Sequence, residues 1–310
     1  MRKLTVDLMM AVVVLVWGAS YTIGKYGMQS LSPEVFTLTR FLLVIPVLLV
    51  IVKWRDGNLA IAKRDIPALL FAALVGIALY QTLFISAVKY TTATNSSLLI
   101  SMAPLFTVMG AVIGRQEKLG ITLLVGSVLS VLGVFLIKGL GAEAISFEED
   151  TLFGDLLALT ASLLFGLYPF TITGLSKRYS SIKLTFYTSV FGAVMLAVYC
   201  GPEWFQVDWS QLPAAAWWSL LYAAYPVTAY ALVAWNYGIE VLGPSRTMPY
   251  LYLVPVTAIL IAMLWLDEQM NGWQWLGAGL ILFGVFLVRQ GHMVVEMWRK
   301  KWSIRDEKSA

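Results

Sequence analysis

Ten long apolar stretches follow one another along the chain, separated by short polar segments. Nine of them contain no Asp, Glu, Lys or Arg, and the tenth contains only Arg40. Because about 17–20 consecutive apolar residues cross the hydrocarbon core of a bilayer, the pattern predicts ten transmembrane helices joined by loops that average about 10 residues. The stretches are residues 8–24, 35–52, 66–88, 90–114, 119–137, 156–176, 184–202, 209–239, 247–266 and 269–288.

The composition of the 310 residues agrees with a membrane protein. Hydrophobic residues make up 59% and charged residues 13%, about half the share of a soluble domain, and the mean hydropathy is +0.77. One cysteine (Cys200) and one histidine (His292) leave no disulfide framework and no Cys/His zinc site. The chain contains no Walker sequence, and no Asp or Glu lies deep in a predicted span. We therefore expect no metal, no cofactor and no ATP hydrolysis.

Basic residues gather on one side of the predicted bundle. If the N-terminus lies inside, 18 of the 22 Lys and Arg residues fall on the inner face, three fall on the outer face, and Arg40 lies within a span. Acidic residues collect in the outer loops instead. The positive-inside rule then predicts that both termini are cytoplasmic, in a multi-pass protein of a bacterial-type inner membrane.

The two halves of the chain repeat each other. Each half holds five predicted spans, an odd number, so the second half enters the membrane from the opposite side. The sequence therefore predicts an all-α membrane protein of ten transmembrane helices, built as two inverted five-helix repeats around a central cavity. We place the repeats at residues 8–138 and 153–290, followed by a basic cytoplasmic tail, 291–310. A shift of 151 residues aligns Pro104 with Pro255, Glu117 with Glu268, Gly126 with Gly277 and Gly133–Leu136 with Gly284–Leu287, and a shift of 148 aligns Gly18 with Gly166 and Ser32 with Ser180.

Several short motifs resemble a known family. The first half contains Trp17-Gly18-Ala19-Ser20 and the run Thr94–Leu99, and the second contains Gly243-Pro244-Ser245 and Pro255-Val256. Together with the repeated Pro, Glu and Gly positions, they resemble two tandem EamA domains of the drug/metabolite transporter superfamily. The resemblance implies a ten-helix fold with a central cavity, and the superfamily includes amino-acid and metabolite exporters. The halves differ at Arg40, whose counterpart is Thr188.

Arg40 is the one charge well inside a predicted span. An ionisable side chain there costs at least about 2.5–3.5 kcal/mol on insertion scales, so a functional role is the first hypothesis. In one interpretation Arg40 binds a substrate carboxylate through a bidentate pair. In the other, it snorkels outward to Glu34 or to helix-end carbonyls and locks the outer gate.

The remaining candidates for substrate binding are aromatic or polar side chains inside spans. A few aromatic walls with sparse polar groups suit a small-molecule cavity. The alternatives are packing or lipid contact for the aromatic residues and interhelical hydrogen bonds, worth about 0.6 kcal/mol, for the polar ones. Arg246 lies one helical turn before Tyr250, which predicts that both share a helix face. The full set is Trp17, Tyr21, Arg40, Tyr80, Gln81, Asn95, Ser101, Tyr168, Trp235 and Tyr250.

Two prolines and four glycines complete the prediction. Pro104 and Pro255 bend corresponding helices, and we expect them to be symmetric gating hinges. The pairs Gly126/Gly133 and Gly277/Gly284 are each seven residues apart, on one helix face, which is typical of close backbone packing.

We expect a secondary transporter that exports small metabolites, first of all amino acids or related carboxylates, by alternating access. A broad-specificity drug exporter with a looser apolar cavity is the alternative within the same fold. A membrane-embedded enzyme is disfavoured, because the sequence offers no catalytic constellation. The expected partners are a small-molecule substrate and the lipid bilayer, without nucleic acid; a monomer and a homodimer both stay open.

Overall fold

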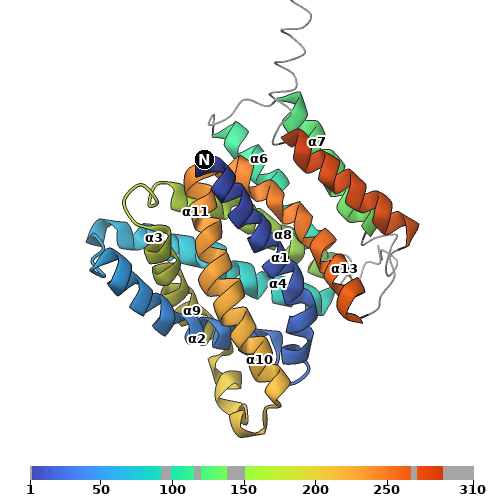
Figure 1. Cartoon of the computed structure of the whole chain (residues 1–310). Helices are drawn as coiled ribbons and strands as arrows, with labels where there is room; N and C mark the ends of the chain where they lie inside the picture. Colours follow the sequence, from blue (N-terminus) through green and yellow to red (C-terminus); the bar gives the residue numbers. More distant parts are fainter. Residues whose placement is uncertain (1, 92–98, 115–119, 138–150, 267–270, 289–310) are drawn as a thin grey trace, which may run out of the picture.

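The computed structural model describes residues 2–91, 99–114, 120–137, 151–266 and 271–288, and within these ranges the chain is helical and contains no strand. Figure 1 shows the arrangement of the helices. The long helices are α1 (Arg2–Met28), α2 (Pro33–Asp56), α8 (Leu152–Thr173) and α9 (Ser181–Gln206). The shorter ones are α3 (Ile66–Ala73), α4 (Leu79–Tyr90), α6 (Ala103–Ile113), α7 (Ile121–Phe135), α10 (Ala214–Tyr222), α11 (Val233–Leu242), α12 (Pro244–Thr247), α13 (Leu253–Leu266) and a helix over Gly272–Val288.

Among the described residues, five helical segments are long and apolar enough to cross a bilayer by length and composition. They are Leu4–Met28, Pro33–Asp56, Lys63–Phe84, Leu152–Thr173 and Ser181–Gln206. Three further helices are also apolar but shorter, with 10–17 residues each: Ala103–Ile113, Ile121–Phe135 and Gly272–Val288. The count of ten spans stays a prediction.

Two serines begin two long helices in the same way. Ser32 precedes α2 with extended backbone angles (φ −61°, ψ 151°), and its hydroxyl accepts a hydrogen bond from the Val35 N–H. Ser180 precedes α9 with nearly the same angles (φ −63°, ψ 150°) and accepts from the Lys183 N–H. Each serine satisfies one of the free N–H groups of its helix start. The aligned pair Ser32/Ser180 is therefore a pair of equivalent N-caps.

A π-helical segment lies within an apolar stretch of each half. Leu74–Ala78 joins α3 to α4, and Ala223–Leu232 joins α10 to α11. A shift of 151 residues places the first segment inside the second. π-Helical turns are rare and are frequent at functional sites, so their matching positions draw attention to these two helices.

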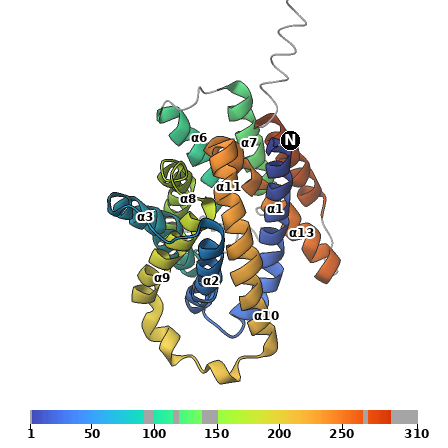
Figure 2. The same cartoon turned by 60° about the vertical axis from the view of Figure 1, so that its left-hand side comes forward.

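Close backbone contacts of aligned glycines join the two halves. A Cβ on Gly18 of α1 would lie 2.9 Å from the backbone nitrogen of Ala258, and one on Gly166 of α8 would lie 2.5 Å from the carbonyl oxygen of Ala103. Thus α1 of the first half packs on α13 of the second, and α8 of the second half packs on α6 of the first. In Figures 1 and 2, α1 lies between α13 and the continuous α10–α11 run.

The helix pair α7 and Gly272–Val288 is held by glycines facing glycines. A Cβ on Gly126 would lie 2.5 Å from the carbonyl oxygen of Gly284, and one on Gly133 would lie 2.5 Å from that of Gly277. The contacts are reciprocal, and their order is reversed between the two helices, so the helices are antiparallel. The close backbone packing predicted for these four glycines is confirmed.

Candidate functional site

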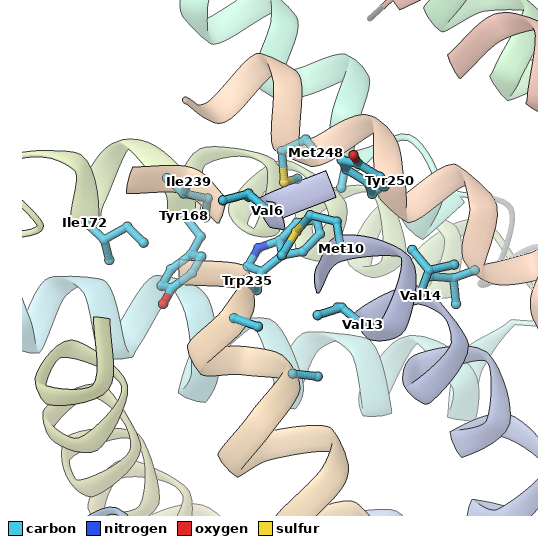
Figure 3. Close-up of a cluster of buried hydrophobic side chains, with 14 of the residues drawn as sticks. Val6, Met10, Val13, Val14, Tyr168, Ile172, Trp235, Ile239, Met248 and Tyr250 are labelled. Atoms are coloured by element: carbon cyan, nitrogen blue, oxygen red, sulfur yellow. The ribbon is translucent and has the colours of Figure 1, made fainter. Parts of the chain in front are cut away.

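Four of the predicted aromatic residues gather in one buried cluster. Tyr168 of α8, Trp235 of α11 and Tyr250 lie in its core, and Trp17 of α1 packs against it. The rings of Trp17 and Trp235 are 4.9 Å apart between centroids and tilted by 46°. Figure 3 shows Trp235 at the middle of the cluster, next to Met10 of α1. Residues from α1, α8, α11 and the segment before α13 thus meet in one cluster, and their role in substrate binding stays a prediction.

Tyr80 reaches the same cluster through Phe165. The Tyr80 and Phe165 rings stack at 4.7 Å, and Phe165 and Tyr168 are parallel at 6.5 Å. The three rings form a row from α4 to α8. Phe165 was not among the predicted residues, although the 148-residue shift aligns it with Trp17. That alignment was the signal that would have found it.

Tyr168 is fixed at both ends. Its hydroxyl donates to Asn236 Oδ1 over 3.0 Å, and Asn236 Nδ2 donates to Thr185 Oγ1 over 2.9 Å, so the buried chain joins α8, α11 and α9. Its ring lies on Gly76 in the first π-helical segment, where an added Cβ would come within 2.1 Å of a ring carbon. Sequence reasoning missed Asn236 and Thr185, although an Asn inside a charge-free stretch is itself a signal of interhelical hydrogen bonding.

Arg40 is half-buried on α2, and its guanidinium carbon lies 4.9 Å from the centre of the Phe41 ring. Its Nε is buried and has no hydrogen-bond partner. Among the described residues the ion pairs involve Asp65 and Asp56, and none joins Arg40 to Glu34. The snorkelling interpretation through Glu34 therefore lacks its contact here. Trp235 Nε1 is a second buried donor without a partner.

The two predicted hinges lie directly after irregular backbone. Pro104 is in the first turn of α6, after a turn at Ser101 and Met102. Pro255 is in the first turn of α13, after a 3₁₀ helix over Met248–Tyr252. These breaks correspond under the 151-residue shift, which is consistent with a common hinge but does not test it.

The other predicted residues are dispersed. Gln81 and Ser101 are half-buried, whereas Asn95 and the side chain of Tyr21 lie outside the described residues. The Tyr250 hydroxyl donates to Asp7 Oδ1 over 3.0 Å. The prediction that Arg246 and Tyr250 share a face is wrong: Arg246 is exposed and Tyr250 is buried. Between the two residues the chain changes from α12 to the 3₁₀ helix over Met248–Tyr252. A 3₁₀ helix has three residues per turn rather than 3.6, so residues four apart no longer lie on one face.

Two surface pockets are lined by residues outside the buried aromatic cluster of Trp17, Tyr168, Trp235 and Tyr250. One, of about 230 Å³, is bounded by α1, α10 and α13 and is lined mainly by apolar side chains. The other, of about 310 Å³, is lined by Glu34, Tyr199, Cys200, Pro202 and Glu203. Neither contains a predicted site residue. The central aromatic side chains pack on one another instead, so a central cavity stays a prediction.

Comparisons with known proteins identify the family. The model of the EamA-like transporter family matches residues 4–139 and again 152–290. An "Uncharacterized transporter" of Archaeoglobus fulgidus is 30% identical over 90% of this chain and 96% of its own, and the "Uncharacterized transporter YyaM" of Bacillus subtilis is 26% identical over 92% and 93%. A protein of Streptantibioticus cattleyicolor named "Probable terminal-alkyne amino-acid exporter" is 26% identical over 89% and 91%.

A solved crystal structure has the same fold. It superposes with a TM-score of 0.78 over 91% of this chain and 95% of its own, at 16% identity. The two family matches, the apolar helices and the transporter relatives agree with one another. They identify an all-helical membrane protein that is a transporter and not an enzyme, and the chain belongs to the EamA-like transporter family.

Proposed function

We propose that the protein is an inner-membrane secondary transporter that exports small carboxylate-bearing metabolites, amino acids first, by alternating access. In this proposal both termini are cytoplasmic and ten helices form two inverted repeats. Arg40 attracts the carboxylate, and the aromatic residues around Trp17, Tyr168 and Trp235 surround the rest of the substrate.

The observation that carries the proposal is an excess of buried donors. Arg40 Nε on α2 and Trp235 Nε1 on α11 are both buried without an acceptor. The neighbouring indole, Trp17 Nε1, reaches only the Val227 carbonyl at a long 3.4 Å. A buried donor left unpaired costs about 1–3 kcal/mol. A carboxylate is an acceptor-only group that relieves such a cost, whereas a cationic drug brings more donors and needs a buried acid.

The pairing of the two halves supports alternating access. The N-caps Ser32 and Ser180 are related by the 148-residue shift, and the π-helical segments and the packed glycines by the 151-residue shift. Inverted repeats of this kind exchange their conformations when a transporter changes the side on which its site is open. The relative from Streptantibioticus cattleyicolor, named as an amino-acid exporter, is in keeping with the substrate class.

Efflux from intact cells loaded with a panel of dipeptides tests the proposal. Cells with the protein are compared with empty-vector cells, with Arg40→Ala and with Arg55→Ala, which removes an exposed arginine from the same helix. We expect excess efflux of a subset of amino acids, a loss of about tenfold or more in Arg40→Ala, as an unpaired substrate charge implies, and none in Arg55→Ala. No excess efflux of any amino acid would refute the substrate class and favour the drug exporter.

A further inference from the structure

Two polar turns from different halves of the chain are clasped together. The first, Asp56–Asp65, follows α2, and the second, Arg178–Lys183, leads into α9. Arg178 Nη2 lies 2.8 Å from Asp65 Oδ1, and the Tyr179 hydroxyl donates to Asp65 Oδ2 over 2.7 Å. The Tyr179 hydroxyl also accepts from the Ala62 N–H over 2.9 Å. Only 4% of the Asp65 side chain is exposed, so the acid is enclosed by the second turn.

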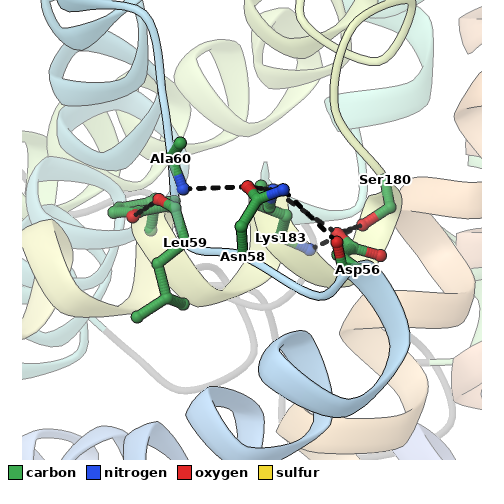
Figure 4. A network of polar contacts seen from close by, with 7 residues as sticks. Asp56, Asn58, Leu59, Ala60, Ser180 and Lys183 are labelled. Carbon is green, nitrogen blue, oxygen red and sulfur yellow. Dashed lines mark hydrogen bonds and ion pairs between the residues drawn. The ribbon is translucent and has the colours of Figure 1, made fainter.

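A second ionic contact joins the same turns (Figure 4). Lys183 Nζ lies 3.8 Å from Asp56 Oδ2 and donates to Asn58 Oδ1 over 3.2 Å. The Ser180 hydroxyl donates to Asp56 Oδ2 over 2.5 Å. The Lys183 side chain is 8% exposed. The two acids of the first turn, Asp56 and Asp65, thus each meet a basic residue of the second turn across the boundary between the halves. We call these four charged residues, Asp56, Asp65, Arg178 and Lys183, the clasp.

The clasp lies at the end of the bundle where α1 begins. Ser181, inside the second turn, donates to Glu240 Oε2 near the end of α11, and the chain then turns into α12. From there Tyr250 donates to Asp7 near the start of α1. Beneath the clasp, Leu69, Leu175 and Leu184 form a small buried layer from α3, the end of α8 and α9. If this end of the bundle opens between α3 and α9, the ion pairs of the clasp must break and the three leucines become exposed to water.

The other end of the contact between α2 and α9 is built differently. There Trp204 of α9 donates to Thr39 of α2 over 2.9 Å, and aromatic side chains pack around them. The acids Glu34 of α2 and Glu203 of α9 line one pocket, and within the described residues neither has an ion pair. Opposite charges therefore hold the clasp end together, whereas like charges face each other at the other end.

We propose that the clasp is the gate of the transport cycle at the end where α1 begins, and that its ion pairs favour the conformation closed at that end. This inference rests on alternating access, and it adds four gating residues and a resting conformation to the proposed function. Removing Arg178, whose side chain is 44% exposed, leaves the enclosed Asp65 carboxylate without its ion-pair partner. The closed conformation therefore loses stability relative to the open one. The site then spends more of its time open on the clasp side.

Thiol labelling measures this opening without any substrate. The chain has one cysteine, so Leu184→Cys in a Cys200→Ser background places a single thiol in the layer beneath the clasp, where Leu184 is 1% exposed. The purified protein is treated in detergent with a water-soluble maleimide, which reaches both ends of the bundle. Arg178→Gln breaks the Asp65 pair. Arg64→Gln makes the same charge change on an exposed neighbour of Asp65 and is the matched control.

We expect Arg178→Gln to speed labelling by about tenfold, equivalent to about 1.4 kcal/mol, and Arg64→Gln to leave it at the parent rate. The exchange Asp65→Arg with Arg178→Asp keeps an ion pair in place and restores protection. Tyr179→Phe keeps every charge and speeds labelling by about threefold through the lost hydrogen bond, which decides the matter if Arg178→Gln does not fold. If Arg178→Gln and Tyr179→Phe are both labelled at the parent rate, the proposed gate is overturned. A failed efflux assay would leave the labelling result unaffected and would overturn the substrate class instead.

Discussion

Replacing Gly277 by alanine tests the packing that joins the two C-terminal helices of the halves. The new Cβ would lie 2.5 Å from the carbonyl oxygen of Gly133 and 2.9 Å from Cγ1 of Ile137. The first contact is with backbone, which cannot rotate away as a side chain does, so the two helices must separate locally. Overpacking of this kind costs about 1–3 kcal/mol. Because the contact is reciprocal, Gly133→Ala has the same geometry and the same expected cost.

Gly279 supplies the matched control, two residues away on the same helix. A Cβ there has no atom within 4 Å, so Gly279→Ala adds a methyl group to open space and improves helix propensity by up to about 1 kcal/mol. Thermal unfolding of the purified variants in one detergent gives the readout. At about 2–4 °C per kcal/mol, Gly277→Ala lowers the midpoint by about 2–12 °C, whereas Gly279→Ala leaves it equal or higher. A Gly277→Ala midpoint at or above that of Gly279→Ala would refute the close packing.

Three further predictions concern the centre of the bundle. Tyr168→Phe removes the buried hydrogen bond to Asn236 and is expected to lower the unfolding midpoint by the equivalent of about 1 kcal/mol, measured in the same detergent; an unchanged midpoint contradicts the bond. Gly76→Ala drives a methyl group into the Tyr168 ring, so we expect the unfolding midpoint to fall by the equivalent of about 1–3 kcal/mol; in a Tyr168→Ala background, which lacks the ring, the same glycine substitution should cost much less, and an equal cost in both backgrounds speaks against the contact. Pro104→Ala should change the transport rate while the amount of protein in the membrane stays constant, as immunoblots check, and an unchanged rate would refute the hinge.

Much of the architecture follows from repetition in the sequence. The aligned serines proved to be equivalent N-caps, because a Ser hydroxyl before a helix satisfies a free N–H of its first turn. The two glycine pairs proved to pack on each other, Gly126 against Gly284 and Gly133 against Gly277, because only glycine allows two helix backbones to come so close. Where local geometry changes, the prediction fails. The Arg246–Tyr250 spacing assumes one continuous α-helix, and the 3₁₀ helix at Met248 breaks that assumption.

The site was harder to predict than the helices. Trp17, Tyr168 and Trp235, which share one cluster, were chosen only as aromatic residues inside spans, and a charge-free stretch does not say which face of a helix points inward. Asn236 and Thr185 were missed for that reason, since their roles arise only from the packing of α9 on α11 and α8. The clasp was missed too: its basic residues were only counted among the positive charges of the inner face, and their acidic partners lie about 113–127 residues away in sequence.

Counterflow in proteoliposomes tests the central claim, that buried donors recognise a carboxylate. Once efflux has identified a transported amino acid, its uptake is measured in competition with the same amino acid and with its amide, which differ only at the carboxylate. We predict that the acid competes at least about tenfold better than the amide, as expected for a charge-assisted pair, and that Arg40→Gln removes the difference. Equal competition by acid and amide in the unmodified protein would contradict the account.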